Sequence, residues 1–425
     1  MRVWNTIAAW EAYHGYYKRT LTVRDKEVDP NIRINLARVI VNKSVTALFG
    51  KEITLDVTDD EQTGDTDTLT KAQRYLDATW RHNHKMALLQ KVALNGCMSG
   101  DLFMQLVPVP TTLPRLVNLD PTMCDVETSP SDFEDVTKYT VYQLGYASDG
   151  TTLYSRDTWT RKDTTWDEAR ETSLDGETWT EVATGVWGYP FPPIVHWQNL
   201  PLPNSYFGLP TLTEDILHLI GKLNLTLSNW NKTALMHGHP KQYGIGFEAS
   251  ELQTAPDETI VLPDKDSKLG LLEMRSSGEQ MDRLYMRLRE ALNELARLPE
   301  VSTGKVESIG VLSGLALHIL YQPALELTSQ MRVLAGPALE ELCQRILTIG
   351  GFPNLGVSIE WPELLPGDPE LEGRVLEKDA KLGLASRETL ARKRGYDPNK
   401  ERARMEREET EETEEDDANT EPGKP

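Results

Sequence analysis

Cysteine is scarce in this sequence. The three cysteines, Cys97, Cys124 and Cys343, lie too far apart for a disulfide framework or for a zinc site built on thiolates. Apolar runs long enough to cross a bilayer are also missing, and the polar, aromatic N-terminus does not resemble a signal peptide. These absences predict a soluble protein that is made in a reducing cytoplasm and has no membrane partner.

Positive charge is also in short supply. The 425 residues include 45 lysines and arginines against 66 aspartates and glutamates, which gives a net charge of −21. Proteins that hold nucleic acid do so largely by neutralising phosphates, so this balance argues against stable nucleic-acid binding. It still allows a protein that lets nucleic acid pass. Hydrophobic residues make up 39% of the chain, which is enough for a large core divided among two or three subdomains.

Recognisable catalytic motifs are a third absence. Ser302–Lys305 resembles the end of a phosphate-binding loop, but Pro299 occupies the position of the first glycine and no strand precedes the segment. Two His-x-His pairs have a spacing that suits metal ligands: His82 with His84, and His237 with His239. Neither pair has a third ligand nearby in the sequence, so surface or capping histidines are the better interpretation.

A faint nuclease signal lies near the C-terminus. Pro366-Gly367-Asp368 followed by Asp379-Ala380-Lys381 has the order of carboxylates and lysine found in metal-dependent nucleases. These residues fall in a predicted helix, whereas such a nuclease core needs a hairpin. A nucleophile elbow of the G-x-S-x-G type does not occur. We therefore expect a structural protein that is not an enzyme and uses no metal or cofactor.

The first hundred residues have mainly helical periodicity. Asp29-Pro30 has the pattern of a helix N-cap followed by proline, and it predicts the start of a helix that ends at Gly50. An alternating strand should follow at Ile53–Val57. Two further helices are expected at about 69–80 and 85–98.

From about residue 102 to 199 the pattern changes to short extended runs, separated by turn pairs such as Asp149-Gly150 and Asp175-Gly176. The predicted strands are 102–107, 116–119, 139–146, 159–166, 178–183 and 194–197. Five tryptophans lie here: Trp159, Trp166, Trp179, Trp187 and Trp197. A ligand-stacking box is one interpretation, but aromatic residues at strand spacing more often pack in a sheet. We expect a β-rich subdomain inserted between helical parts.

Two capping boxes predict the starts of two long helices. They are Thr211 with Glu214, and Ser276 with Glu279. The first helix should run to about Met236 and the second to about Leu298, so the two are suited to lie antiparallel. The segment 239–275 between them is rich in glycine and proline, with β-like runs at 242–247 and 259–262. This order predicts a small module at the tip of a helical hairpin.

The longest amphipathic stretch is Ser313–Ile349, in which apolar residues recur every three or four positions. Pro323 and Gly336-Pro337 should bend this helix, and Gly350-Gly351 should end it. A connector bounded by glycines, residues 301–310, leads into it.

The C-terminal part begins with one more alternating strand at Gly356–Trp361. Asp368-Pro369 and Ser386 then predict the starts of two helices, and Asp397-Pro398 the start of a last charged one. From Glu406 onward there are ten acidic and two basic residues without apolar periodicity, which is typical of a disordered tail.

Several segments together carry a family resemblance. They are Leu36–Lys43 leading to Leu48–Lys51; Gly100-Asp101, Leu119-Asp120-Pro121 and His196–Asn199 before Gly208-Leu209-Pro210; Ser313–Leu317; and Ile359–Trp361 with Leu365-Pro366, Glu370 and Glu372. These segments are similar, in turn, to the first helix, the wing, the tunnel-helix start and the approach to the crown of siphovirus-type portal proteins, the head-to-tail connectors of tailed bacteriophages. The resemblance covers roughly residues 30–405. The Trp-rich strands at 154–187 match no portal motif.

The resemblance implies an α+β fold that is mainly helical. It implies a wing at 1–210 with a β-rich insertion, stem helices at 211–238 and 276–300, and a small α/β clip at 239–275. It further implies a tunnel loop at 301–312, a kinked tunnel helix at 313–351, a wing strand return at 352–368, crown helices at 369–405 and an acidic tail at 406–425.

The function implied by the resemblance is that of a ring, usually of twelve subunits, at one vertex of the capsid. Terminase drives double-stranded DNA through such a ring during packaging, and the DNA later leaves by the same route. The implied partners are further copies of this chain, transiently bound DNA, the terminase large subunit, the major capsid and scaffolding proteins, and a head-completion or tail adaptor protein. The implied location is the virion, with assembly in the host cytoplasm.

The resemblance also assigns roles to individual residues. The DNA-facing loop would contain Thr303, Gly304, Lys305, Glu307 and Ser308, with Lys305 contacting phosphate. The tunnel-helix start and kinks would be Ser313, Gly314, Pro323, Gly336 and Pro337. The clip would present Lys241, Gln242, Tyr243, Asp264, Lys265 and Asp266 to terminase or adaptor proteins. Judged from the residues alone, Lys305 could equally be a solvated lysine in an ordinary connector.

Two alternatives remain open at this point. Another head or neck protein, such as a minor capsid protein or an adaptor, is the structural alternative. Such a protein gives no reason for a module on a helical hairpin followed by a long bent helix, and adaptors are usually shorter. A metal-dependent nuclease is the alternative from a different functional class.

Overall fold

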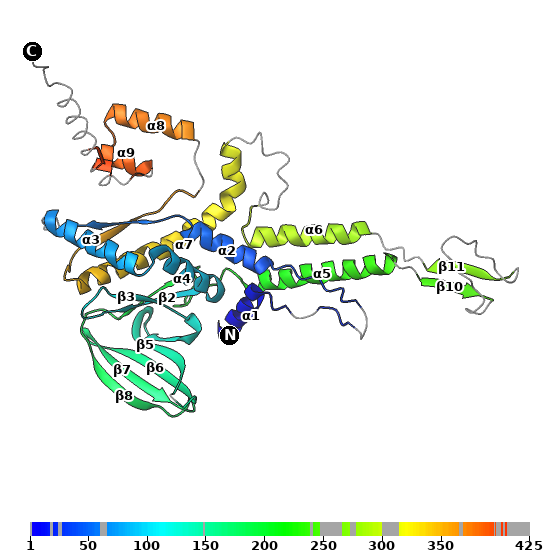
Figure 1. Ribbon diagram of the computed structural model, residues 1–425, viewed down its shortest axis with the longest axis horizontal. Helices are drawn as coiled ribbons and strands as arrows, with labels where there is room; N and C mark the ends of the chain where they lie inside the picture. The colour runs from blue at the N-terminus through cyan, green and yellow to red at the C-terminus, as the bar shows by residue number, and fades with distance from the viewer. Residues whose placement is uncertain are drawn as a thin grey trace, which may run out of the picture. The chain divides into compact units, whose positions relative to one another are not determined.

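The computed structural model contains helices and antiparallel sheets (Figure 1), and the predicted α+β class is confirmed. The structure describes residues 2–17, 20–23, 28–59, 66–147, 149–238, 241–246, 266–272, 278–299, 314–364, 369–394, 396, 401–402 and 404–405. The chain divides into two units, one of residues 1–307 with 320–362 and the other of 308–319 with 363–425.

Two N-terminal helices, α1 (Arg2–His14) and α2 (Leu36–Phe49), pack on each other and on α4 (Lys85–Ser99). Helix α1 is not predicted from the sequence, because its buried positions include the small residues Ala9 and Ala12. The predicted start of α2 at Pro30 is wrong. The helix begins at Leu36, where the Asn35 side chain accepts a hydrogen bond from the Arg38 N–H (2.9 Å).

Long-range hydrogen bonds keep residues 30–34 out of the helix. Side chains of α5 (Glu214–Gly238) bind the backbone of this segment. The Ile32 N–H donates to Ser228 Oγ (2.9 Å), the Ile34 N–H donates to Asn224 Oδ1 (3.0 Å), and Asn231 Nδ2 donates to the Pro30 carbonyl (3.0 Å). These tertiary contacts override the local signal of Asp29-Pro30.

A two-stranded sheet packs beside α3 (Thr66–His82) in the same core. Its strands, β1 (Thr54–Thr58) and β12 (Gly356–Glu360), pair antiparallel from distant parts of the chain. Gln73 of α3 holds β1 by accepting from the Val57 N–H and donating to the Leu55 carbonyl, both at 2.8 Å. Helices α3 and α4 and both strands agree with the predictions.

Two antiparallel sheets form the β-rich region (Figure 1). The three-stranded sheet has the order β3 (Arg115–Leu119), β2 (Asp101–Val107), β9 (Ile194–Gln198). The five-stranded sheet follows the chain: β4 (Cys124–Ser129), β5 (Asp132–Tyr146), β6 (Thr152–Lys162), β7 (Thr165–Ser173), β8 (Thr180–Trp187). A 3₁₀ turn, η1 (Pro121–Met123), links β3 to β4. Phe103 and Ile194 of the smaller sheet and Tyr139 and Trp159 of the larger one share a core cluster.

The predicted strand at 159–166 is wrong. Strand β6 ends at Lys162, and a turn with Asp163 in the left-handed region (φ 52°) leads into β7. Trp159 and Trp166, on either side of this turn, are 2% and 5% exposed and belong to the core. The tryptophans therefore pack mainly in the sheets, which is the interpretation that the sequence favoured over a ligand-stacking box. Both predicted turn pairs are confirmed, since Gly150 and Gly176 have φ of 84° and 78°.

Helices α5 and α6 (Gly278–Leu295) pack side by side (Figure 1). The first capping prediction is wrong, because α5 begins at Glu214 and Thr211 is buried before it. The Thr211 hydroxyl, which would have to cap the helix, instead accepts a hydrogen bond from Asn199 Nδ2 (3.1 Å), and the Thr211 N–H donates to the Cys97 carbonyl (2.9 Å). The second predicted cap, Ser276, lies outside the described residues.

Beyond these two helices, β10 (Lys241–Ile245) and β11 (Lys268–Leu272) form an antiparallel pair. The predicted run at 242–247 agrees with β10. The predicted run at 259–262 lies outside the described residues, and the sequence analysis does not predict β11.

Helix α7 (Gly314–Ile349) continues through both Pro323 and Pro337. Neither proline ends the helix, and the bends expected at these points stay a prediction. The predicted end at Gly350-Gly351 is confirmed, because Gly351 has φ 83° and the Phe352 N–H donates back to the Leu347 carbonyl (2.9 Å).

The second unit contains α8 (Pro369–Leu382) and α9 (Arg387–Lys393). Ser386 caps α9 as predicted, since its Oγ accepts a hydrogen bond from the Thr389 N–H (3.1 Å). The caps expected at Asp368 and Asp397 and the acidic tail at 406–425 lie outside the described residues. No helix in the described part of the chain is long and apolar enough to cross a membrane.

Candidate functional site

Several of the residues that carry the family resemblance meet at one buried junction. Asp101, the first residue of β2, is fully buried. Its Oδ1 lies 3.0 Å from His196 Nε2 and accepts a hydrogen bond from the Gly208 N–H (2.9 Å). The backbones at Gly100 and Gly208 are so close that a Cβ on either residue would lie 2.4 to 2.5 Å from the carbonyl oxygen of the other. Both positions therefore require glycine.

The same junction fixes the start of α5. The Asn199 N–H donates to the Gly100 carbonyl (2.8 Å). Its side-chain amide donates to the Leu209 carbonyl (3.2 Å) and to Thr211 Oγ1 (3.1 Å). Burial raises the pKa of the adjacent Cys97 thiol to about 11. The end of α4, two strands and the loop before α5 are thus joined by hydrogen bonds that leave little freedom in the direction of α5.

The outer surface of α6 combines charged and apolar side chains. Arg283 forms an ion pair with Glu279 one turn earlier (2.6 Å). Leu284 and Leu295 are 52% and 49% exposed, and their separation of about three helical turns places them on one face. The polar residues Asn224 and Ser228 of α5 are instead buried, where they bind the segment before α2. Polar residues at buried helix positions were a signal of this contact that the sequence analysis missed.

The β10–β11 pair is held by an aromatic ring over a glycine. Tyr243 lies opposite Gly270, and a Cβ at position 270 would lie 2.6 Å from the Tyr243 ring. Tyr243 is nevertheless 48% exposed, and Ile245 is 55% exposed. Of the predicted clip residues, Lys241, Gln242 and Tyr243 lie in β10 and Asp266 is exposed just before β11, whereas Asp264 and Lys265 lie outside the described residues.

Helix α7 is anchored to the sheet by Arg345, which is 8% exposed. Its Nη1 donates to the carbonyls of Pro192 (2.6 Å) and Ile194 (2.8 Å), and Nη2 pairs with Glu341. The guanidinium also lies 5.3 Å from the centre of the Phe191 ring. The sequence offered a signal for this anchor, because an arginine interrupts an otherwise apolar helix face.

The five residues of the predicted DNA-facing loop lie outside the described part of the chain, as does Ser313 of the predicted tunnel-helix start. The loop residues are Thr303, Gly304, Lys305, Glu307 and Ser308. Gly314 is the first residue of α7. Pro323 and Pro337 are exposed. Gly336, which lies in α7 next to Trp361, is buried. The structure therefore describes the elements that flank the predicted loop, and the loop's own role stays a prediction.

Among the described residues, neither the histidine pairs nor the nuclease signal is part of a metal-binding group. Within these ranges no three His, Cys, Asp or Glu side chains are grouped so that they could hold a metal ion. His84 is the N-cap residue of α4 with φ 55°, and its side chain makes no capping hydrogen bond. Asp379 and Lys381 lie on α8, where Lys381 pairs with Glu377 (2.7 Å). Asp368 and His239 fall outside the described residues.

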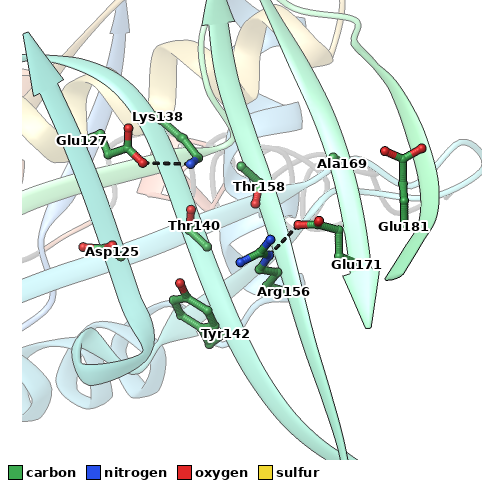
Figure 2. A pocket seen from close by; sticks show the side chains of 10 residues that line it. All are labelled: Asp125, Glu127, Lys138, Thr140, Tyr142, Arg156, Thr158, Ala169, Glu171 and Glu181. Carbon is green, nitrogen blue, oxygen red and sulfur yellow. Dashed lines mark hydrogen bonds and ion pairs between the residues drawn. The ribbon is translucent and has the colours of Figure 1, made fainter. Parts of the chain in front are cut away.

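A hollow of about 200 Å³ lies on the five-stranded sheet, on the face opposite its core (Figure 2). Two ion pairs between neighbouring strands flank it, Lys138 with Glu127 (2.8 Å) and Arg156 with Glu171 (2.5 Å). The Arg156 guanidinium also lies 4.3 Å from the centre of the Trp179 ring. Its hydrogen bond to Glu171 lowers the pKa of that carboxyl.

The comparison with known families decides the identity of the chain. A sequence model described as "Phage portal protein, SPP1 Gp6-like" matches residues 6–415. The chain belongs to this phage portal family. The match covers nearly the whole chain and extends further toward both ends than the resemblance predicted from residues 30–405.

Structural comparison gives the same fold. One solved structure, "Neck of empty GTA particle computed with C6 symmetry", matches with a TM-score of 0.51 and 13% identity over 93% of this chain and 94% of the other. At this identity the likeness concerns the fold alone. No curated protein matches the chain.

Family membership makes this chain a structural component of a phage particle with a portal, or head-to-tail connector, role. The predicted resemblance is confirmed. Neither alternative, the minor capsid or adaptor protein and the nuclease, matches the family found over residues 6–415.

Proposed function

We propose that this chain forms an oligomeric ring at one vertex of the capsid and that double-stranded DNA enters and leaves through its centre. The observation that carries the proposal is the match of the portal family to residues 6–415. The related fold in the neck computed with C6 symmetry supports a closed ring, and twelve subunits would be compatible with such symmetry.

In this ring each segment has a role. Residues 1–210 with 352–368 form the wing, α5 and α6 form the stem, and residues 239–275 form the clip. The exposed Tyr243 and Ile245 of β10 give the clip an apolar contact surface, which would meet the terminase large subunit and later the head-completion or tail adaptor protein. The crown, residues 369–405, and the wing would face the capsid interior and its scaffolding and major capsid proteins.

The connector at 301–312 is the proposed DNA-facing loop. A chain with net charge −21 does not hold a polyanion along its whole surface, because phosphate binding requires neutralising cations. A single Lys305 per subunit would supply weak contacts that moving phosphates exchange easily. Thr303, Gly304, Glu307 and Ser308 would surround it without adding net positive charge.

Exposed apolar residues suggest where neighbouring subunits meet. Leu284 and Leu295 share one face of α6, and Val333 of α7 is 69% exposed. Burial of these side chains against the next subunit would remove apolar area from water and stabilise the ring. A Val333→Asp variant should then form fewer rings than the wild type.

Electron microscopy of the purified full-length protein tests the proposal directly. Closed rings of about a dozen subunits with a central hole are expected. A protein that stays monomeric in every buffer, at any concentration, would overturn the portal function.

A further inference from the structure

Strand register builds a trough across the outward face of the five-stranded sheet. Asp125 lies opposite Thr140, Thr140 opposite Thr158, Thr158 opposite Ala169, and Ala169 opposite Thr184. Four small side chains in one row across four strands leave a groove perpendicular to the strands. Strands are spaced about 4.8 Å apart, so the floor from Asp125 to Thr184 extends on the order of 19 Å.

Larger side chains in the neighbouring rows form the walls of this trough (Figure 2). One wall is the cross-strand pair Glu127–Lys138. The other contains Tyr142 and the pair Arg156–Glu171. Trp179 packs on Arg156 and within 6.1 Å of the Tyr142 ring, which stiffens this second wall.

The charges of the trough are only partly neutralised. Its lining contains the two bases Lys138 and Arg156, and each already has a carboxylate partner in the opposite strand. Asp125 on β4 and Glu181 on β8 are exposed and form no ion pair with any described residue. Both edges of the trough therefore present an acidic group, and its net charge is −2 (two bases against Asp125, Glu127, Glu171 and Glu181).

This arrangement distinguishes among possible occupants. A second copy of the sheet would bring the acidic edge of β8 against the acidic edge of β4, which like charges disfavour. Nucleic acid is repelled for the same reason. An extended, basic segment of another protein fits, because its backbone can cross the small floor while lysine or arginine side chains reach the two acidic edges.

We propose that the trough is a docking site for an extended basic segment of a partner protein. The floor length matches about six residues of extended chain at roughly 3.3 Å each. Ala169 and the exposed Thr184 accept aliphatic side-chain stems beside the buried Thr140 and Thr158, and Asp125 and Glu181 bind the cationic ends. The proposal concerns the wing sheet alone and does not depend on ring formation or DNA passage.

Fluorescence anisotropy with the full-length protein tests this site. The probe is a labelled nonapeptide of alternating threonine and lysine, compared with the same peptide carrying glutamate in place of lysine. The lysine peptide should bind and the glutamate peptide should not. The Asp125→Asn/Glu181→Gln variant should weaken binding of the lysine peptide on the order of 25-fold, about fivefold for each surface ion pair.

Two further variants separate a built site from general attraction to an acidic protein. Glu134→Gln/Glu177→Gln changes the net charge equally but away from the trough, and it should leave binding unchanged. Ala169→Phe keeps every charge while it fills the floor, and it should abolish binding. Equal losses in both charge variants, or full binding by Ala169→Phe, would overturn the proposal. So would a loss of self-association in Asp125→Asn/Glu181→Gln, because it would identify a second copy as the occupant.

Discussion

Asp101 is a carboxylate that the fold has removed entirely from water. Its contacts with His196 Nε2 and the Gly208 N–H connect β2 to β9 and to the loop before α5. When one partner is deleted from a buried polar cluster, the groups that it bound lose a hydrogen bond while they stay buried. The free-energy cost of this desolvation usually exceeds the net contribution of the hydrogen bond to stability. This one residue therefore stabilises the junction that orients the α5–α6 pair.

Asp101→Ala should lower the free energy of unfolding by about 1 to 3 kcal/mol for each of the two buried groups whose hydrogen bond it removes, measured by urea titration of the purified protein. Asp120→Ala is a suitable control, because Asp120 is exposed and caps only the short η1 turn through the Thr122 N–H (2.9 Å). It should cost about 1 kcal/mol. Equal losses in the two variants would contradict the proposed importance of the buried junction.

The buried thiols make the stability of the protein change with pH in the alkaline range. Burial raises the pKa of Cys97 to about 11 and that of Cys343 to about 12, from a usual value near 9. Because the folded pKa is the higher one, the stability from keeping each thiol neutral is fully present below about pH 9. It is lost as pH rises toward the folded values.

Ionisation of each thiol in the unfolded chain should lower the free energy of unfolding by about 1.4 kcal/mol on going from pH 7 to pH 10. The Cys97→Ala/Cys343→Ala variant should be less stable than the wild type at pH 7 but should lose about 3 kcal/mol less on going to pH 10. Urea titrations at the two pH values measure this difference. Identical pH dependence in the two proteins would show that the thiols stay neutral in the unfolded chain as well.

At the scale of elements, two helical glycines with opposite surroundings offer a matched pair. Gly336 lies in the middle of α7, and a Cβ there would meet only Trp361 Nε1 at an ordinary 3.9 Å. Gly96 lies in α4, where a Cβ would come within 2.6 Å of the buried Leu102 side chain. Gly336 lowers the helix propensity of α7 although a larger residue would fit. Gly96 permits a close contact between α4 and β2.

Gly336→Ala should raise the free energy of unfolding by about 0.5 to 1 kcal/mol, because alanine restricts the unfolded chain and favours helix. Gly96→Ala should lower it by about 1 to 3 kcal/mol through overpacking. Thermal unfolding followed by circular dichroism measures both. Destabilisation by Gly336→Ala would indicate that α7 needs a flexible point beside Pro337, as the predicted bend requires.

At the scale of the whole molecule, the acidic character of the chain limits how a portal can contact DNA. With 45 basic against 66 acidic residues, contacts with phosphates must be few and local. The proposed loop at 301–312 places one such contact in each subunit. The exposed apolar residues of α6 and α7 are instead proposed to serve contacts between subunits.

Lys305→Ala should form rings as the wild type does but should change the amount of DNA packaged or retained per particle. The measurement is DNA content of particles assembled with the variant, beside electron microscopy of its rings. Lys378→Ala removes an equal charge from an exposed position on α8 and should leave packaging unchanged. Failure of Lys305→Ala to form rings would assign the loop a structural role.

Local sequence was sufficient for the main elements. Periodicity placed α3, α4, β1, β12 and α7 within a few residues, and glycines marked the turns at Gly150 and Gly176 and the end of α7, because helix and strand spacing and positive φ are local properties. The combination of these elements with short motifs was enough to indicate the portal family.

Tertiary structure decided what local patterns could not. Asn224 and Ser228 hold residues 30–34 out of the helix that Asp29-Pro30 would start, and Asn199 binds the Thr211 hydroxyl that would otherwise cap α5. The trough on the five-stranded sheet exists only because register aligns Thr140, Thr158 and Ala169 from three strands. In each case the deciding contact joins residues far apart in the chain, and its hydrogen bonds and packing outweigh local preferences worth about 1 kcal/mol.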